Sequence, residues 1–533
     1  MITRSSLIVA LALIIAAALP GRAAEPNKSD LLEQMAREKF GALSHAEVLL
    51  LRSAPERDLE WAGPRDDPDD PSNNPVNSEA WGPDRTIRAP LVAWLASDPV
   101  ASRLVHPSGA GIKAARIAGL LDLSYQKVPF PLTLIRCVIK QGVDISNARL
   151  RDLDLRASIT GPIMGEMATV DGDVTLTFGA YDQVTFYRAS ISGTIDFSAA
   201  RVQSAEVPAI SGVEASVGGD VLFHQGLASS GPVDFSTNAM VDFRLIRIGH
   251  ALSFNHARFF GPGENGLNAE RATIQGPLYW VAISHTSRTQ LDLADARCSE
   301  LWDDQSSWPA PGNLMLTGFQ YGGFGGDSPA TAESRLAWIA RQPRGFHAQP
   351  YAELAKALMA GGESDDAIQV EIAQRVAQRR DGGLGMAERI WNALLQVTIG
   401  YGFIPLRALW WILGFVAFGT VLFRWGYALR AVSPTEGSAY DSFMQSGTTP
   451  PHYPPFNAFV YSLENFLPVV DLHQGEYWRP NPSSGAANNL HPADEQRAYA
   501  GIFLRWYLWI HILAGWILTP LLAAGLSGLI HVG

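Results

Sequence analysis

Four aspartates that recur within a repeating pattern are the first candidates for chemistry. Asp144, Asp196 and Asp292 each lie between two apolar residues, and Asp234 belongs to the same series. Carboxylates aligned on one outer face could provide the acid and the base with which a β-helix enzyme cleaves a polysaccharide. We favour a structural role, in which each aspartate occupies a solvated position between two inward-facing residues, because Ser253 replaces it in one copy.

Three residues in a short apolar segment form the second candidate site. Tyr461, Glu464 and Asp471 lie within 456–472, between two longer apolar stretches of the chain. An ionisable group at membrane depth is energetically costly and often functional, which makes the two carboxylates candidates for a role inside a membrane. We favour the alternative that the segment lies flat at the membrane surface, with both carboxylates in water.

The sequence contains no other recognisable catalytic, cofactor-binding or metal-binding pattern. A Gly-x-Gly-x-x-Ala pattern at 109–114 follows a turn-like His-Pro-Ser and not a strand, which disfavours dinucleotide binding. The histidines lack the spacing of metal ligands, and there is neither a Gly-x-Ser-x-Gly motif nor a phosphate-binding loop. We therefore expect no catalytic residue, no cofactor and no metal, and we lean against an enzyme.

The element that must position the aspartates is a repeat region over 105–325. A pattern of the form apolar-x-Gly-x-apolar-x-apolar recurs at 117–123, 170–176, 191–197, 217–223 and 274–280. A second pattern ends in Ala-Arg-apolar, and its alanines are spaced by 57 residues from Ala200 to Ala257 and by 39 from Ala257 to Ala296. Both spacings are close to multiples of ~19–20 residues, as expected for the coils of a solenoid.

The repeat predicts a mainly β fold, a right-handed β-helix solenoid of ten or so coils. Alternation with a period of two is typical of very short strands that send every second side chain inward. The glycines and the small alanines permit tight corners, and each coil must stack on its neighbours to bury its apolar face. The strands are not separated by the helical periodicity that an α/β fold would need.

The segments outside the repeat region divide the chain further. We predict a signal peptide, an N-terminal cap and linker, a helical hairpin cap, a first membrane helix region, a loop with a short apolar helix and a second membrane helix, at 1–24, 25–104, 326–390, 391–430, 431–500 and 501–533. The first 24 residues combine a basic start, a short apolar stretch and a small-x-small cleavage site. Ser44 opens a short helix, and the Pro-, Asp- and Asn-rich stretch 64–83 is linker-like.

Two uncharged apolar stretches, 408–423 and 506–533, predict membrane spans. Gly515 and the Gly525-x-x-Gly528 pattern could let another helix approach the second span closely. The segment 456–472 is too short and too polar to span, and Pro468 breaks it. We therefore predict a re-entrant or interfacial helix there.

Charge and cysteine content limit the partners and the cross-links. The net charge is −11, and no basic stripe is present, so we do not expect nucleic acid as a partner. The two cysteines, Cys137 and Cys298, lie many repeats apart. Because a disulfide needs Cα atoms within ~7 Å, we expect two isolated buried thiols.

Several features together resemble bacterial pentapeptide-repeat-like membrane proteins. The features are coils of ~20 residues, the stretch Asn-Ala-Arg-Leu-Arg-Asp-Leu-Asp-Leu at 147–155, a hairpin at 351–380, and a Tyr-Ser-Leu-Glu helix at 461–464 between two spans. The resemblance implies a β-helix joined to a two-helix, channel-like membrane module. Such relatives are sometimes labelled membrane-associated oxidoreductases. The chain departs from the pattern in its loose pentapeptide register, and no Thr-x-Gly-Tyr-Gly filter of a potassium channel is present.

These observations lead us to expect a non-catalytic, membrane-anchored scaffold or binding and sensing protein of the bacterial envelope. The alternatives are an oligomeric channel-like protein that uses 456–472, and a carbohydrate-active β-helix enzyme. The expected partners are the lipid bilayer, envelope proteins, or further copies of the chain through the membrane helices. The signal peptide places the β-helix in the periplasm and the spans in the inner membrane, whereas the positive-inside rule does not decide the orientation, because arginines flank the first span on both sides.

Overall fold

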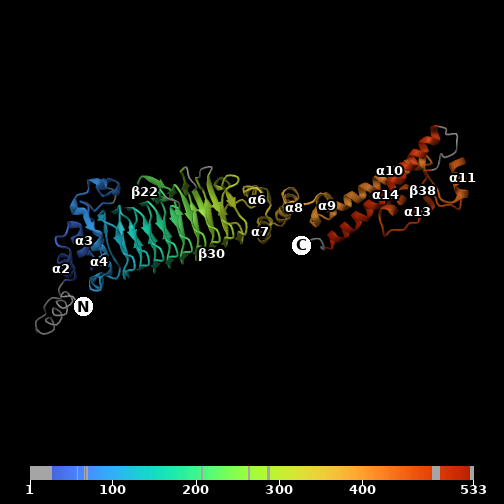
Figure 1. Ribbon diagram of the computed structural model, residues 1–533. Coiled ribbons are helices and arrows are strands. Elements are labelled where there is room, and N and C mark those ends of the chain that lie inside the picture. The colour runs from blue at the N-terminus through green and yellow to red at the C-terminus, as the bar shows by residue number, and fades with distance from the viewer. Residues whose placement is uncertain are drawn as a thin grey trace. The chain divides into compact units, whose positions relative to one another are not determined.

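The computed structural model describes residues 27–527, apart from residues 57, 65, 68–69, 206–207, 262–264, 285–287 and 483–491. The predicted signal peptide and the end of the predicted second membrane helix lie outside the described residues. The chain forms two compact units, which divide between Val370 and Glu371. The first unit contains the repeat region, and the second contains the apolar helices (Figure 1).

The first unit is a parallel β-solenoid, which confirms the predicted fold class. Four parallel sheets, which we call faces A to D, run along it with nine, eight, nine and eight strands. Each full coil adds one strand to face A, then B, C and D, so the solenoid has about nine coils. Inward side chains of every face are buried in one continuous apolar core.

The strands of the four faces are short, and most have two to four residues. Face A comprises β2 (Ala110–Lys113), β5 (Leu132–Ile135), β9 (Leu153–Asp154), β13 (Val174–Thr175), β17 (Ile195–Asp196), β21 (Val221–His224), β27 (Leu252–Asn255), β31 (Leu278–Val281) and β34 (Leu301–Asp303). Face B comprises β1 (Thr86–Arg88), β3 (Arg116–Ala118), β6 (Val138–Ile139), β10 (Ile159–Thr160), β14 (Ala180–Tyr181), β18 (Arg201–Val202), β24 (Ser236–Thr237) and β28 (Arg258–Phe259).

The other two faces follow the same plan. Face C comprises β4 (Leu121–Asp122), β7 (Val143–Asp144), β11 (Ile163–Met164), β15 (Val184–Thr185), β19 (Ile210–Ser211), β25 (Met240–Asp242), β29 (Asn265–Asn268), β32 (Thr289–Asp292) and β35 (Leu314–Met315). Face D comprises β8 (Arg149–Leu150), β12 (Thr169–Val170), β16 (Ser190–Ile191), β20 (Ser216–Val217), β26 (Arg247–Ile248), β30 (Thr273–Ile274), β33 (Arg297–Cys298) and β36 (Gln320–Tyr321).

Two of the four corners in a regular coil use a left-handed residue that is not glycine. Asn147, Ala157 and Met167 have φ near +57°, +56° and +56°, and comparable residues recur along the solenoid. The residue after most of them is small and buried, as Ala148 and Ala168 are. Most of these corners therefore combine a left-handed residue with a small buried side chain, which agrees with the expectation that small alanines permit tight corners.

Four of the five glycines of the repeated pattern serve the corner between faces D and A, for a steric reason, whereas Gly119 lies between faces B and C. A Cβ atom on Gly193 would lie 2.7 Å from the carbonyl oxygen of Gly172 in the preceding coil. A Cβ on Gly218 would lie 2.3 Å from the carbonyl oxygen of Ser192, and one on Gly249 would lie 2.2 Å from that of Gly218. Glycine recurs there because successive coils approach backbone to backbone.

The alanine spacings of the sequence do not measure whole coils. Ala200 and Ala257 precede strands of face B, whereas Ala296 precedes β33 of face D. The pattern occurs at both left-handed corners of a coil and so repeats every half turn. The regular coils are 21 residues long, as the hydrogen bonds from Asp173 N to Asp152 and from Thr194 N to Asp173 show.

The N-terminal end of the solenoid is covered by a helical cap. Its elements are α2 (Lys28–Phe40), α3 (His45–Ser53), η1 (Pro71–Asn73), η2 (Pro75–Ala80), η3 (Pro83–Arg85), α4 (Ala89–Ser97) and α5 (Ala101–Leu104). Ser44 and Glu47 form a capping box on α3, as the sequence predicts. The described part of 64–83 is folded against the first coil, because Trp81 is buried and Arg85 donates to the carbonyl of Ala114.

The other end of the solenoid is covered by α6 (Ala332–Ile339) and α7 (Ala348–Ala360), and the hairpin predicted at 351–380 corresponds to α7 and the helix that follows it. The inward row of face A runs through Phe223, Phe254 and Trp280 and ends at Asp303 in the last coil. Asp303 forms a buried ion pair with Arg335 of α6, and the two N···O distances are 2.6 and 2.8 Å. The apolar core therefore ends on a charged pair that joins it to the cap.

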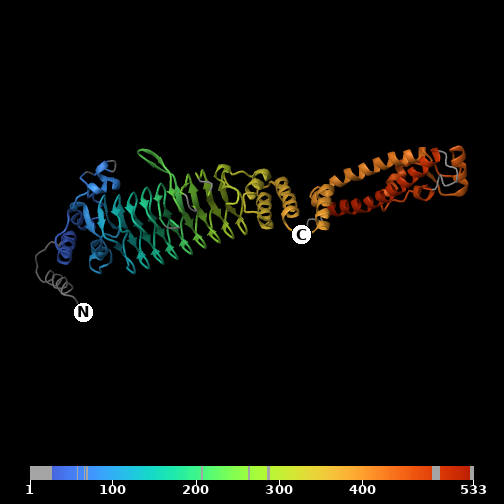
Figure 2. The same cartoon turned by 45° about the horizontal axis from the view of Figure 1, so that its top comes forward.

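A hairpin interrupts the regular coils near the middle of the solenoid. The strands β22 (Gly226–Ala228) and β23 (Gly231–Val233) pair antiparallel between β21 and β24. Figure 2 shows the hairpin projecting from the side of the solenoid. Its Leu227 side chain is 81% exposed.

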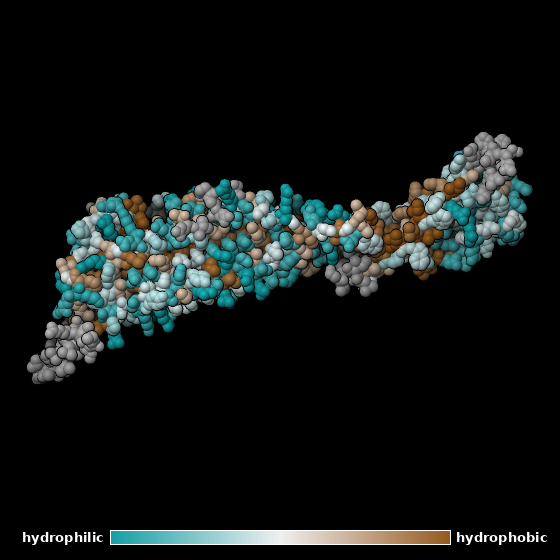
Figure 3. All heavy atoms as spheres, in the orientation of Figure 1, coloured by the Kyte–Doolittle hydropathy of each residue, from teal (hydrophilic) through white to brown (hydrophobic). Residues whose placement is uncertain are grey.

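The second unit is helical. Its elements are the end of α8 (Ser364–Asp381), α9 (Met386–Ile399), η5 (Gly400–Gly402), α10 (Leu406–Ala428), β37 (Val432–Pro434), α11 (Gly437–Ser446), α12 (Ala458–Phe466), α13 (Gln474–Tyr477), β38 (Trp478–Pro480) and α14 (Pro492–Leu526). Two of these helices are long and apolar enough to cross a membrane, α10 and the part of α14 from Gln496 to Leu526. Hydrophobic surface gathers over them in Figure 3.

Candidate functional site: a short helix between two apolar helices

The segment that contains the short helix α12 begins and ends at the same end of the second unit. Strand β37 directly follows α10, and β38 precedes α14; the two strands pair antiparallel, with Val432 opposite Pro480. The side chain of Asn457 caps the start of α12 by accepting hydrogen bonds from the N–H groups of Phe459 and Val460. The helix ends at Phe466, before Pro468, as the backbone restriction ahead of a proline requires.

Helix α12 reaches the middle of both long helices. The hydroxyl of Ser462 donates to the carbonyl oxygen of Val416, halfway along α10, at 2.9 Å. A ring nitrogen of His511, halfway along the apolar part of α14, lies 3.0 Å from the carbonyl oxygen of Ser462. This position, level with the middle of both apolar helices, is the one expected of the re-entrant alternative for 456–472, whereas the sequence analysis favoured a helix that lies flat at the surface.

Glycines allow the three helices to approach closely. A Cβ atom on Gly419 of α10 would lie 2.4 Å from the hydroxyl of Ser462. A Cβ on Gly515 of α14 would lie only 1.7 Å from the carbonyl oxygen of Phe466. Gly515 therefore admits another helix, as the sequence suggests, and that helix is α12 of the same chain. Gly525 packs against Pro405, and Gly528 lies outside the described residues.

The structure places Tyr461, Glu464 and Asp471 in three different surroundings. Tyr461 is buried, and its ring meets that of Phe423 edge to face, with the two ring centres 4.9 Å apart. Glu464 accepts hydrogen bonds from the N–H groups of Gln474 and Gly475 at 2.8 and 3.1 Å, and so caps α13. Asp471 is exposed and accepts a hydrogen bond from the N–H of His473 at 3.0 Å.

These three residues do not converge on one site. Glu464 holds the two ends of the segment that returns from α12 to the end of the unit, residues 467–473, which we call the return segment. Tyr461 packs in the aromatic core that includes Phe423 and Phe456. Asp471 lies on the return segment itself, where its exposed carboxylate contacts His473.

The polar centre of the unit is a group that the sequence analysis does not single out. Ser462, Tyr507 and His511 are linked, with the hydroxyl of Tyr507 3.2 Å from His511 Nδ1. His511 and Ser462 are completely buried. The sequence signal for this group was the spacing of four residues between Tyr507 and His511 in the uncharged stretch 506–533, because that spacing puts both side chains on one face of a helix.

The repeated aspartates of the solenoid cap its left-handed corners. Asp144, Asp196 and Asp292 each accept a hydrogen bond from the N–H two residues later, just before the left-handed residue. Asn268 makes the same bond to Glu270, so the charge is dispensable. This explains why the chain repeats an aspartate that also tolerates a neutral replacement.

The aspartates also fail to line up as one ladder. Asp144 and Asp292 lie on face C, Asp196 lies on face A, and Asp234 accepts a hydrogen bond from Gln225 beside the projecting hairpin. Burial raises the pKa of the Asp292 carboxyl, and the charge of Glu270 raises it further. The geometry therefore supports the structural interpretation of the repeated carboxylates.

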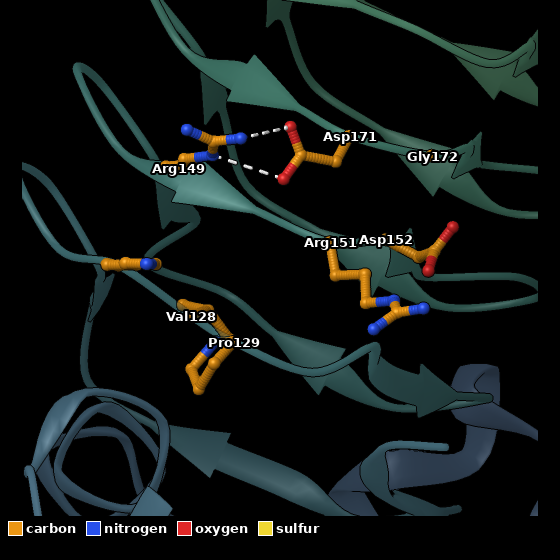
Figure 4. A pocket seen from close by; sticks show the side chains of 8 residues that line it. Val128, Pro129, Arg149, Arg151, Asp152, Asp171 and Gly172 are labelled. Atoms are coloured by element: carbon orange, nitrogen blue, oxygen red, sulfur yellow. Dashed lines mark hydrogen bonds and ion pairs between the residues drawn. The ribbon is translucent and has the colours of Figure 1, made fainter. Parts of the chain in front are cut away.

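One open groove of about 600 Å³ lies on the solenoid surface, near its N-terminal end (Figure 4). Three of its lining side chains are basic and two are acidic: Lys127, Arg149, Arg151, Asp152 and Asp171. Arg149 donates two hydrogen bonds to Asp171, at 3.0 and 3.1 Å, and Asp152 accepts one from the N–H of Asp173. Both carboxylates therefore already serve the contacts between coils.

Among the described residues, no group of three or more His, Cys, Asp or Glu side chains is placed to hold a metal ion. The two cysteines are free and buried, which agrees with the expected pair of isolated thiols.

We predict that neither thiol reacts with maleimide in the folded chain. Burial raises the pKa of Cys137 and of Cys298 to about 12. At pH 9 only about one thiol in a thousand would then be a thiolate, the reactive form, and access is blocked as well. Mass spectrometry after labelling at pH 7 to 9 should show no adduct, and two adducts should appear in guanidinium. Labelling of the folded chain that rises with pH from 7 to 9 would contradict this prediction.

No protein-family model matches the chain, and neither a curated protein nor a solved structure matches it. Its function must therefore be inferred from its own geometry.

Proposed function

We propose that the chain is a membrane-anchored solenoid that works as a non-catalytic scaffold or binding platform of the bacterial envelope. The observation that carries this proposal is the exposure of two long apolar helices in the second unit. In their most apolar windows only 28% of α10 and 22% of the α14 span are buried by the rest of the unit. A lipid bilayer would cover such surfaces, whereas the core helix of a water-soluble protein is covered by protein.

The solenoid supports a binding role more than a reaction. Its repeated aspartates cap corners, and the carboxylates of its groove already accept hydrogen bonds within the fold. We place the solenoid in the periplasm and the spans in the inner membrane, because the first 24 residues have the composition of an export signal. Envelope proteins that dock on its long faces are the proposed partners.

The test is the accessibility of single cysteines in intact cells. Leu227→Cys lies on the exposed hairpin of the solenoid, and Ser438→Cys lies on exposed α11 between the two spans. The native thiols are buried and provide no background. The proposal predicts that a membrane-impermeant maleimide labels Leu227→Cys and reaches Ser438→Cys only after lysis. The reverse pattern would place the solenoid in the cytoplasm and overturn the localisation.

A second candidate function, an oligomeric channel-like protein, is favoured by the return segment. Phe466 and Leu467 pack with Ile412 and Leu518, well inside the two spans, and Val469 just beyond them is 90% exposed. Non-helical backbone at membrane depth is tolerated only where protein covers it or where it lines a water-filled cavity. If several copies of the chain turned their return segments toward a common axis, neighbouring copies would cover this backbone and the axis would provide the water-filled cavity.

Cross-linking in the membrane tests the channel-like arrangement. Val469→Cys should form disulfide-linked dimers rapidly under mild oxidation, because the return segments meet at the axis. Trp410→Cys is the matched control, since this residue is 75% exposed on the outer surface of α10 and should face lipid. Dimers with Trp410→Cys and none with Val469→Cys, or a monomeric mass in detergent and in nanodiscs, would rule the arrangement out.

A further inference from the structure

Helix α9 carries an apolar stripe on one side and most of its polar side chains on the other. Met386, Ile390, Leu394 and Val397 follow one another at helical spacing and form one stripe. The opposite side carries polar side chains, which are Glu388, Arg389, Asn392 and Gln396. Such a helix on a water-soluble protein buries its apolar stripe against the core and leaves its polar side in water.

In this structure, by contrast, the apolar stripe of α9 is exposed. Exposure is high along the apolar face, at 74% for Met386, 64% for Ile390, 52% for Trp391 and 51% for Val397. Toward the end of the helix the polar side contacts protein, whereas Glu388 and Arg389 near its start are exposed. Asn392 accepts a hydrogen bond from the hydroxyl of Tyr401 at 2.7 Å, and the same oxygen lies 3.5 Å from Arg379 Nη1.

The position of α9 in the second unit points to what covers the apolar face. The helix leads through η5 into α10, and it packs on α10 and on α14. The indole N–H of Trp411 donates to the carbonyl of Val397, and Arg407 donates to the carbonyl of Gln396. Both donors belong to the first two turns of α10, so α9 is fixed at the end of the span, where the hydrocarbon of a bilayer gives way to head groups.

We propose that α9 is an interfacial membrane-binding helix whose partner is the lipid bilayer. It lies along the membrane surface, with Met386, Ile390, Trp391 and Val397 in the boundary between head groups and acyl chains. Amphipathic helices of this composition bind membranes through that boundary, and tryptophan is favoured there. Exposed Arg389 lies on the polar side of the helix, where it can reach lipid phosphates. The inference rests on the proposed membrane anchoring and adds a second contact with the bilayer.

Spin labels on the full-length chain in lipid nanodiscs test the proposal. Ile390→Cys and Val397→Cys report on the apolar face, and Glu388→Cys reports on the polar face of the same helix. Val421→Cys, 64% exposed on α10, is the lipid control. Molecular oxygen concentrates in the hydrocarbon and a nickel chelate stays in water. Oxygen should therefore relax the labels at 390, 397 and 421 several-fold more strongly than nickel does, with the opposite order at 388.

Each other outcome overturns a defined part of the argument. If nickel reaches 390 and 397 as well as it reaches 388, while 421 remains in lipid, α9 lies in water and the inference fails although the anchoring stands. If neither reagent reaches 390 and 397, protein covers the face and the bilayer is not its partner. If nickel also reaches 421, the proposed membrane anchoring itself fails.

Discussion

Replacement of Arg335 by methionine is expected to destabilise the C-terminal end of the solenoid by about 3–5 kcal/mol, the cost of removing one partner of a buried ion pair. Arg335 is completely buried and Asp303 is 2% exposed, so the substitution leaves the carboxylate of Asp303 without its cation in an apolar core. Asp303 also accepts a hydrogen bond from the indole N–H of Trp308, which cannot replace the lost charge. The guanidinium of Arg335 lies 3.7 Å from the ring centre of Phe324, and that contact is lost as well.

The measurement is hydrogen exchange of the full chain, followed by mass spectrometry of the peptides that contain β34 and β36. Protection of these strands should fall, whereas the coils near β9 should keep theirs, because a solenoid coil depends mainly on its neighbours. Lys356→Met is the control. Its ion pair with Glu353 is on the surface of the same cap, and such pairs contribute about 0–1 kcal/mol. Adding Asp303→Asn to Arg335→Met should recover part of the loss, and unchanged protection in Arg335→Met would contradict the prediction.

Replacement of Gly515 by leucine is expected to displace α12 from between the two apolar helices. The new Cβ would lie 1.7 Å from the carbonyl oxygen of Phe466, a backbone atom that cannot move unless the end of α12 moves with it. Overpacking of this kind costs about 1–3 kcal/mol. The hydrogen bonds that Ser462 makes with Val416 and His511 should weaken together, because all three helices share the contact.

A thiol at position 462 reports the displacement. In the Ser462→Cys background the buried side chain should label slowly in nanodiscs, and Gly515→Leu should raise the rate about tenfold to hundredfold, since each 1.4 kcal/mol changes an equilibrium tenfold. Gly414→Leu is the matched control, because a Cβ at Gly414 of α10 meets no atom within 4 Å. Equal labelling rates in the two leucine variants would show that α12 is not held by close contact with α14.

If α12 is held in this way, the Ser462, Tyr507 and His511 group has a clear structural consequence. A buried imidazole in an apolar helix is tolerated only where its nitrogen atoms find partners, and here a carbonyl and a hydroxyl provide them. These hydrogen bonds therefore fix how far α12 extends along the two apolar helices. As a result, the return segment starts near the middle of the two apolar helices. The channel-like alternative depends on this position.

Local sequence patterns were sufficient to predict the solenoid, a helical cap and the apolar character of the two long helices. Period-two alternation and recurrent small residues are local properties of the sequence. They could be recognised because every coil repeats the same short strands and tight corners. The capping box of Ser44 and Glu47 was equally local. The coil length was less accurate, because Ala257 and Ala296 follow different corners of a coil, and the sequence pattern of the two corners is the same.

The pairing of polar groups between distant segments could not be predicted from the sequence and is seen only in the folded structure. Asp303 and Arg335 are separated by 32 residues, and Ser462 and His511 by 49, and no local pattern links either pair. Glu464 looked like a free carboxylate in a membrane segment until folding brought the N–H groups of Gln474 and Gly475 to it. A sequence shows which side chains are costly to bury, but the partner that offsets the cost is chosen by packing between distant segments.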